Sequence, residues 1–167
     1  MIFEECFKLL IPNEGGLSLD REDRGNWTSG AIGHGKLKGS KYGISAASYP
    51  DLDIANLTLD DARFIYRRDF WDELQLDAIP DQIDFDMFDM AINSGISRAI
   101  KLLQKTVGAE PDGVLGPKTL HKTNSYGPLL RQHLNAYRLL YYTSLSSSWE
   151  TQGKGWTNRV ANNMLKT

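Results

Sequence analysis

The fold class is decided by residues 58–107, which read TLDDARFIYRRDFWDELQLDAIPDQIDFDMFDMAINSGISRAIKLLQKTV. Apolar side chains recur along this stretch every three or four positions, which is the spacing of one face of an α-helix. Thr58 and Asp61 are placed as a capping box, in which each side chain binds a backbone amide of the first turn. Ser97 is expected to cap a later helix. The side chains predicted to face a core are Ala62, Ile65, Tyr66, Phe70, Trp71, Phe85, Phe88, Ile92, Ile100, Leu103 and Val107.

The same periodicity continues toward the C-terminus. Turn signals in EPDGVLGPKTL, residues 110–120, precede a short helix. Residues 128–144 predict a longer helix, a polar break follows at residues 144–148, and residues 156–166 predict a closing helix. The positions of the longer helix that are spaced for burial are Leu130, Leu134, Tyr137 and Tyr141. The C-terminal half is therefore expected to be helical almost throughout.

Toward the N-terminus the pattern changes. Residues 2–14 predict one more helix, which the following pair of glycines would stop. Residues 15–57 are rich in glycine and predict turns and short strands, which could form a lobe over a substrate groove. No repeat and no linker divides the chain. We therefore expect one mainly α domain over residues 1–167, with a small irregular or β lobe flanking the groove.

The composition excludes several classes of protein. The 167 residues are 41% hydrophobic and 24% charged, and the net charge of −2 argues against a nucleic-acid-binding protein. No run approaches the roughly 20 apolar residues of a membrane span, so stable membrane insertion is not expected. Glu4 and Glu5 stand where a signal peptide carries positive charge, which predicts synthesis in the cytoplasm without export. The lone Cys6 is expected to be a buried structural thiol.

Among the residue types that carry chemistry, only the carboxylates form a plausible group. The three histidines stand far apart outside any zinc motif, and neither a nucleophile elbow nor a phosphate-binding loop is present. We therefore expect no metal and no cofactor. Glu14 would end the predicted helix over residues 2–14, where the helix dipole favours a protonated carboxyl, as a general acid requires. A solvated surface glutamate is the alternative that its position alone leaves open.

Two aspartates, Asp20 and Asp23, follow Glu14 closely. A glycosidase needs a second group that activates water or stabilises the oxocarbenium-like transition state, and an aspartate on this loop could face Glu14 across a groove. Arg21 and Arg24 could instead pair with these aspartates and make the cluster structural. The residues alone leave both interpretations open.

An ordered set of motifs resembles one known family. The motifs are Glu14-Gly15-Gly16, Asp20-Arg21-Glu22-Asp23, Gly25-Asn26-Trp27-Thr28, Lys41-Tyr42-Gly43-Ile44-Ser45, SYPDLDIANLTLDDARFIYRRDFWDEL, FDMAINSG with Asn93, AIKLLQKTVGAEPDGVLGPKTL and GKGWTNRV. Together they span nearly the whole chain and resemble the lysozymes of glycoside hydrolase family 108, many of which are bacteriophage endolysins. The chain departs from the family's pattern at Ser40, where Thr is expected, and at Arg24, where proline often follows the aspartate.

The resemblance implies a lysozyme-like fold that hydrolyses the β-1,4 bond between N-acetylmuramic acid and N-acetylglucosamine in peptidoglycan. It implies that Glu14 is the general acid. Asp23 follows Glu14 at the same interval as the aspartate of phage-type lysozymes in a related superfamily, where a threonine comes a few residues later. Asp23, or a water held by Thr28 or Ser29, is therefore expected to serve as the second group.

The resemblance also divides the chain into a catalytic motif region, residues 1–94, and a helical part, residues 95–167, similar to a predicted peptidoglycan-binding region. This helical part either forms an appended wall-binding module or completes the core of one domain, and the lack of a linker favours the second. Aromatic rings in the glycine-rich lobe offer faces on which sugars stack. The residues expected to bind the glycan are Asp20, Trp27, Tyr42, Tyr49 and Asn93.

The expected function is that of an endolysin, an N-acetylmuramidase that acts as a monomer on peptidoglycan strands. Without an export signal, its release from the host cytoplasm would depend on a separate, holin-like protein that permeabilises the membrane. Three alternatives stay open: a lytic transglycosylase that cleaves the same bond without water, a non-catalytic peptidoglycan-binding protein, and a chitinase-like hydrolase. The chemical ends of the released products separate the enzymes from one another.

Overall fold

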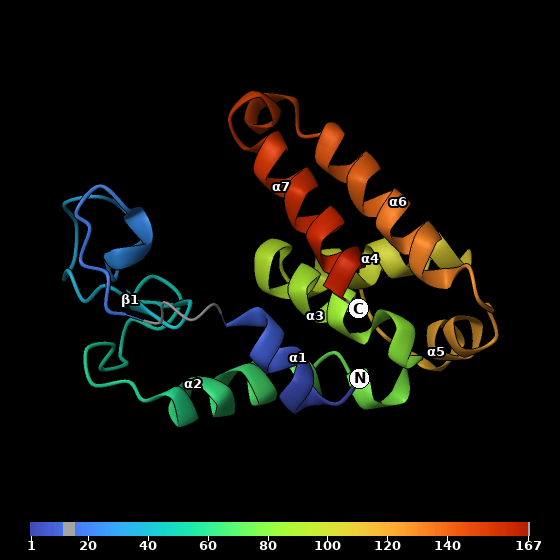
Figure 1. The fold of residues 1–167 in the computed structure, drawn as a ribbon. Coiled ribbons are helices and arrows are strands. Elements are labelled where there is room, and N and C mark those ends of the chain that lie inside the picture. The colour runs from blue at the N-terminus through green and yellow to red at the C-terminus, as the bar shows by residue number, and fades with distance from the viewer. Residues whose placement is uncertain (12–15, 167) are drawn as a thin grey trace. The chain divides into compact units, whose positions relative to one another are not determined.

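The computed structural model describes residues 1–11 and 16–166, and its chain falls into two units (Figure 1). The helical unit comprises Met1–Cys6 and Asp69–Thr167, and the loop unit comprises Phe7–Arg68. The fold is mainly α with a small two-stranded sheet, which confirms the fold class predicted from the sequence.

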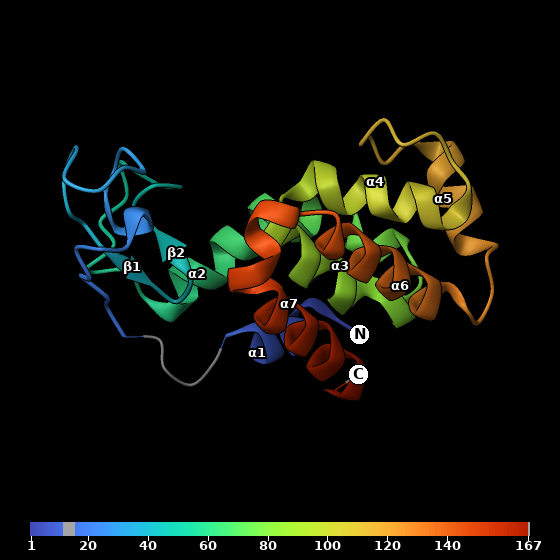
Figure 2. The same cartoon turned by 90° about the horizontal axis from the view of Figure 1, so that it is seen from above.

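Most of the helical unit consists of helices that pack on one another. They are α3 (Asp81–Ser94), α4 (Ile96–Val107), α5 (Pro117–Asn124), α6 (Leu130–Thr143) and α7 (Ser146–Lys166). Helix α3 packs against α4 and α6, α4 also contacts α5 and α6, and α7 packs along α6 (Figure 2). A π-helical turn (Arg67–Asp72) and a 3-10 turn (Leu76–Ala78) precede α3.

Helix α3 forms the centre of the helical unit, since every residue from Ile83 to Ala91 is buried. Three of these residues are aspartates, namely Asp84, Asp86 and Asp89. A carboxylate is tolerated in a core only when a cation or hydrogen-bond donors compensate for the lost water. In that order, their partners are the Met1 amine, Arg131 at 2.7 Å and Arg138 at 2.6 Å.

Aromatic rings fill the space beside α3. Phe3 lies edge-on to Trp71 and to Phe88, with ring centroids 5.4 and 6.0 Å apart, and Trp71 meets Phe88 edge-on at 5.5 Å. Edge-to-face contacts of this kind add to the stabilisation that burial provides. Phe85 is also buried, whereas Phe70 is half-buried, so the predicted core positions of Trp71, Phe85 and Phe88 are confirmed and that of Phe70 is not.

Cys6 is fully buried, as expected of a structural thiol. Its Sγ lies 3.9 Å from Asp84 Oδ1. Burial, followed by the negative charge of Asp84, raises the pKa of the Cys6 thiol to about 12. The thiol therefore stays protonated and unreactive at neutral pH.

The first helix is shorter than the sequence predicts. A helix was expected over residues 2–14, but α1 (Phe3–Leu10) ends at Leu10, and Ile11 already lies outside it. The physical reason is Pro12, because a residue that precedes proline is disfavoured in the helical conformation. The predicted position of Glu14 at the end of this helix lies outside the described residues.

Two other helices begin earlier than expected. Ser97 does not cap α4, because Gly95 with φ +86° ends α3 and also precedes the first residue of α4. Ser97 consequently lies inside the first turn. The polar break predicted at residues 144–148 is confined to its first two residues, since α7 begins at Ser146.

The buried stripe of α6 also differs from the prediction. Leu130 and Leu134 are fully buried as expected, but Tyr137 is 39% exposed. The stripe continues instead through Arg138 and Tyr142. The ion pair with Asp89 on α3 holds Arg138 in the core. Tyr142, four residues later, then lies on the same face of α6 and is buried, whereas the predicted Tyr141 is only half-buried.

The described residues of the loop unit form the end of α1, turns, a short hairpin and helix α2, and the turns and short strands agree with the prediction for residues 15–57. The hairpin pairs β1 (Ser40–Lys41) with β2 (Ile44–Ser45), and α2 (Leu59–Tyr66) follows. The predicted capping box is confirmed at the start of α2. The Asp61 amide donates to the Thr58 hydroxyl at 3.1 Å, and the Thr58 amide donates to the Asp61 carboxylate at 2.9 Å.

Gly43 in the hairpin turn is expected to tolerate no larger side chain. Tyr42 and Gly43 both have positive φ, and a Cβ on Gly43 would overlap the Tyr66 hydroxyl. We expect Gly43→Ala to lower the free energy of unfolding by about 2–3 kcal/mol, measured by urea denaturation. Gly33→Ala is the control, because it has nearly the same φ and open space around it. Equal losses in the two variants would contradict the predicted clash with Tyr66.

Candidate functional site

The predicted site residues fall on three parts of the chain. Asp20, Asp23, Trp27 and Thr28 belong to one loop, residues 18–28, which we name the site loop. Tyr42 and Tyr49 come later in the loop unit, and Asn93 belongs to the helical unit. Glu14, the predicted general acid, lies outside the described residues.

The site loop is organised around the buried Asn26. The Asn26 side-chain amide donates to the Asp20 carbonyl at 2.9 Å. Its backbone carbonyl accepts from the Lys38 and Gly39 amides, each at 3.0 Å. Through its side chain and its backbone carbonyl, Asn26 thus ties the start of the loop to residues 38–39 just before the hairpin, so the loop has a defined shape.

The two aspartates of the site loop shape local turns. Asp20 Oδ1 accepts from the Glu22 amide at 3.0 Å, and Asp23 Oδ1 accepts from the Gly25 amide at 2.8 Å, where it caps a 3-10 turn (Arg24–Asn26). Neither aspartate forms an ion pair with a neighbouring arginine in the described part of the chain. Both carboxylates are exposed and keep one oxygen for another partner.

Hydrogen bonds hold Trp27 to Arg21 within the site loop and Thr28 to Lys36 beyond it. The Trp27 indole N–H donates to the Arg21 carbonyl at 2.9 Å, which fixes the half-buried ring. The Thr28 hydroxyl oxygen accepts from the Lys36 amide at 2.9 Å. Within residues 1–11 and 16–166 the hydroxyl proton of Thr28 has no acceptor, so it is available to a water or a substrate oxygen.

Tyr42 occupies the hairpin turn with φ +52°, a conformation that is uncommon for a tyrosine. The Tyr66 hydroxyl donates to the Tyr42 carbonyl at 3.1 Å and holds the turn against α2. Lys41 Nζ lies 5.4 Å from the centre of the half-buried Tyr42 ring. Backbone strain held in place by its surroundings is a feature of binding and catalytic sites.

Tyr49 lines a cavity of about 420 Å³ that lies wholly within the loop unit. The other aromatic side chain that lines it is Phe64 on α2, which is 62% exposed. The Arg68 guanidinium lies 5.5 Å from the Phe64 ring centre. Exposed rings beside polar groups suit the apolar faces and hydroxyls of a sugar.

The polar lining of this cavity, which we name the aromatic cavity, includes two ionised carboxylates. Hydrogen bonds from Asn56 hold the pKa of Asp53 below its ordinary value, and those from Thr58 do the same for the pKa of Asp61. Both groups are therefore acceptors at neutral pH, as sugar hydroxyls require.

Asn93 is exposed near the end of α3, and a charged network fixes its orientation. Its side-chain amide donates to the Asp89 carbonyl at 2.7 Å and to Asp89 Oδ1 at 3.3 Å. Asp89 is held in turn by Arg138 at 2.6 Å and Arg159 at 2.9 Å. These hydrogen bonds fix the orientation of the Asn93 side chain, which suits a residue that binds substrate.

Sequence reasoning missed two residues of the loop unit. Asn26 carried no signal, because an asparagine in a glycine-rich stretch is usually an exposed turn residue. Phe64 did carry one, since it stands on the face of α2 opposite the buried Ala62 and therefore had to be exposed.

Metal-ligand clusters and membrane-spanning helices are absent from the described residues. No group of three or more His, Cys, Asp or Glu side chains there is arranged to hold a metal ion. None of the helices described is long and apolar enough to cross a membrane.

A mainly α fold with a small loop unit that presents carboxylates and aromatic rings matches the lysozyme-like fold. The sequence profile of the family Glycosyl hydrolase 108 matches residues 7–95, just over half of the chain. The chain therefore belongs to the glycosyl hydrolase 108 family and is an enzyme that hydrolyses peptidoglycan.

A solved structure supports the family assignment. The structure of Brucella abortus SagA is similar to this one with a TM-score of 0.77 and 30% sequence identity, covering 96% of this chain and 90% of that one. No curated protein matches the sequence. The likeness extends over nearly all of both chains and so includes helices beyond the range of the family profile.

Proposed function

We propose that the chain is an endolysin in which Glu14 protonates the glycosidic oxygen between N-acetylmuramic acid and N-acetylglucosamine. The observation that carries the proposal is the family match over residues 7–95, which contains Glu14 and all seven other predicted site residues. The sugar oxygen leaves only after it gains a proton, so the residue that supplies this proton is indispensable to the reaction.

Asp23 is the proposed second group, on the other face of the sugar. Its Oδ1 caps the 3-10 turn, while its Oδ2 has no partner among the described residues and the side chain is exposed. This oxygen can accept a proton from the attacking water or stabilise positive charge on the sugar ring. Thr28, which lies five residues further along the same loop, can orient that water with its free hydroxyl proton.

The role of Asp23 is tested by Asp23→Asn. Asparagine keeps the oxygen that caps Gly25 but cannot take a proton, so we expect kcat on purified peptidoglycan to fall by about 100-fold or more with little change in KM. Asp51→Asn removes an equally exposed carboxylate of the loop unit and should leave kcat unchanged. Near-normal kcat for Asp23→Asn would show that Asp23 only caps the 3-10 turn and takes no part in the reaction.

The aromatic cavity is the proposed place for a sugar ring next to the cleavage point. Tyr49 and Phe64 offer ring faces to the apolar side of the sugar, and the ionised Asp53 and Asp61 offer acceptors to its hydroxyls. The residues closest to this chemistry all belong to the loop unit, as the site loop does.

Release from the host is the last part of the proposal. In this proposal the enzyme is made in the cytoplasm, and a separate, holin-like protein opens the inner membrane so that it reaches the peptidoglycan beyond. We expect bacteria that express the protein in the cytoplasm to stay intact until chloroform permeabilises them, and then to lyse as a monomeric enzyme digests the wall. Lysis without permeabilisation, followed as turbidity, would contradict dependence on such a partner.

A further inference from the structure

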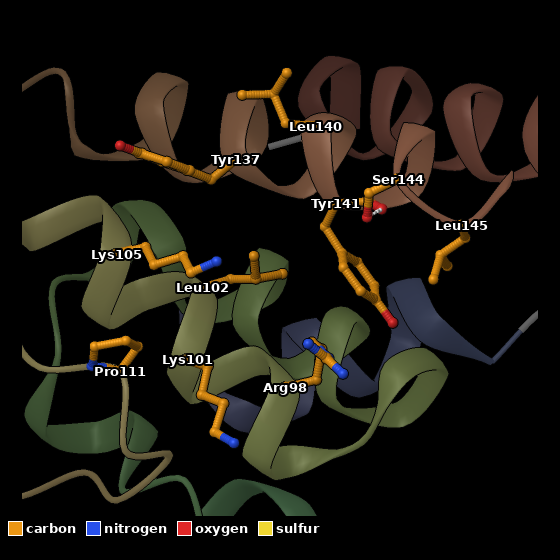
Figure 3. Close-up of a pocket in the computed structure, with 10 residues that line it drawn as sticks. All are labelled: Arg98, Lys101, Leu102, Lys105, Pro111, Tyr137, Leu140, Tyr141, Ser144 and Leu145. Carbon is orange, nitrogen blue, oxygen red and sulfur yellow. Dashed lines mark hydrogen bonds between the residues drawn. The ribbon is translucent and has the colours of Figure 1, made fainter.

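Helices α4 and α6 border a second cavity of about 600 Å³, which contains none of the predicted site residues (Figure 3). We name it the basic groove. Helix α4 contributes Arg98, Lys101 and Lys105, and α6 contributes Tyr137 and Tyr141. No residue that lines the groove is acidic. The groove lies wholly within the helical unit.

The three cations form a row along one face of α4. Their spacing of three and then four residues places them on the same side of the helix, over about 10 Å of its length. No carboxylate lies within ion-pair distance of them in the described part of the chain. Asp112 interacts with Lys101 at a distance, but its Oδ1 already accepts from Gln104 at 2.6 Å. Neighbouring like charges repel, so an anion between them would be stabilising.

The tyrosines of α6 complete a surface that is both polar and apolar. Figure 3 shows the Tyr141 ring reaching from α6 toward Arg98, whose guanidinium lies 4.7 Å from the ring centre. The hydroxyls of Tyr137 and Tyr141 have no hydrogen-bond partner among the residues described, so both can donate to a ligand. Leu102 and Leu145 add apolar surface to the lining.

We propose that the basic groove binds a short acidic peptide, of the kind that peptidoglycan carries as a stem on N-acetylmuramic acid. The identity of this ligand rests on the proposed function. An extended peptide of three or four residues spans about 10–14 Å, which matches the row of cations. Stem peptides combine carboxylates with alanine methyl groups, and the groove combines cations and tyrosine hydroxyls with leucine side chains. A phosphodiester polymer would leave that apolar lining unused.

The groove therefore recognises the peptide that hangs from the glycan, while the loop unit acts on the glycan itself. Each stem peptide would add affinity for substituted strands and none for bare ones. The structure thus assigns a substrate-recognition role to α4 and α6 that depends on charge.

Isothermal titration of the full chain with acetyl-L-Ala-γ-D-Glu-meso-diaminopimelate tests the proposal. Lys101→Glu with Lys105→Glu is expected to weaken binding about tenfold or more, because two attractions become repulsions. Lys118→Glu with Lys166→Glu is the control, since it changes the net charge equally at exposed sites outside the groove and should alter affinity less than about twofold. If the charge-reversed pair fails to fold, Lys101→Gln with Lys105→Gln replaces it.

The proposal would be overturned by no binding of the peptide by the unaltered protein, by equal binding of the same peptide with all its carboxyls amidated, or by equal affinity in the groove variant and its control. A glycerol-phosphate oligomer that binds in place of the peptide would also overturn it and assign the groove to a phosphate polymer. The probe contains no glycan, and Glu14→Gln should bind it normally. Failure of the groove is therefore distinguishable from failure of the proposed catalytic role.

Discussion

Glu14→Gln is expected to lower kcat on purified peptidoglycan by about 10²–10⁴-fold while the fold stays intact. Glutamine has nearly the same size and shape as glutamate but carries no acidic proton, so the leaving sugar oxygen departs without protonation. The rate is followed as loss of turbidity of cell-wall suspensions, and circular dichroism with a thermal melt verifies the fold.

The matched control for this variant is Glu22→Gln. Glu22 is an exposed glutamate of the site loop, and its replacement removes the same charge from the same region. We expect its activity to stay within about twofold of the unaltered enzyme, because surface substitutions away from reacting atoms have small effects. A folded Glu14→Gln protein with near-normal activity would contradict the assignment of the general acid.

Arg138→Ala is expected to lower the free energy of unfolding by about 3–5 kcal/mol. The Arg138 side chain is fully buried, binds Asp89 at 2.6 Å and donates to the Tyr142 hydroxyl at 2.9 Å. Its removal leaves the buried Asp89 carboxylate with the Asn93 amide and with Arg159, which is 45% exposed, so that water screens its attraction to Asp89. Because Asp89 also orients Asn93, activity should fall together with stability.

Chemical denaturation measures this loss, with Lys118→Ala as an exposed control that should change stability by less than about 0.5 kcal/mol. The pair Asp89→Ala with Arg138→Met is expected to recover part of the loss, since it removes both buried charges. A loss below about 1 kcal/mol for Arg138→Ala would show that water or another group compensates for Asp89.

Local signals in the sequence predicted much of the helical architecture. The capping box of Thr58 and Asp61 and the burial of Ile100, Leu103 and Val107 are confirmed, because they depend on contacts within a few turns of one helix. The glycine-rich stretch likewise predicted turns and short strands, since glycine supplies the positive φ that such turns require.

Features that depend on distant parts of the chain escaped prediction. The burial of Arg138 requires Asp89, which stands 49 residues earlier. Its inward position also explains why Tyr137 is exposed, although the spacing of α6 predicted burial. The end of α1 was misplaced because the two glycines were taken as the stop signal, whereas the proline ahead of them ends the helix sooner.

The candidate site divides in the same way. Residue types and spacing identified Asp20 and Asp23 as a pair of interest, but their turn-capping bonds and the Asn26 anchor emerge only from the structure. The choice of Glu14 never depended on local physics alone. It depends on the ordered motifs, and the family match over residues 7–95 supports it.

The most direct test of the central claim is mass spectrometry of the fragments that the protein releases from purified peptidoglycan. A muramidase with Glu14 as its acid adds water across the bond, so the account predicts fragments with a reducing N-acetylmuramic acid end. Fragments with an anhydro end would identify a lytic transglycosylase, and a reducing N-acetylglucosamine end would place cleavage at the other glycosidic bond. Either result would contradict the account.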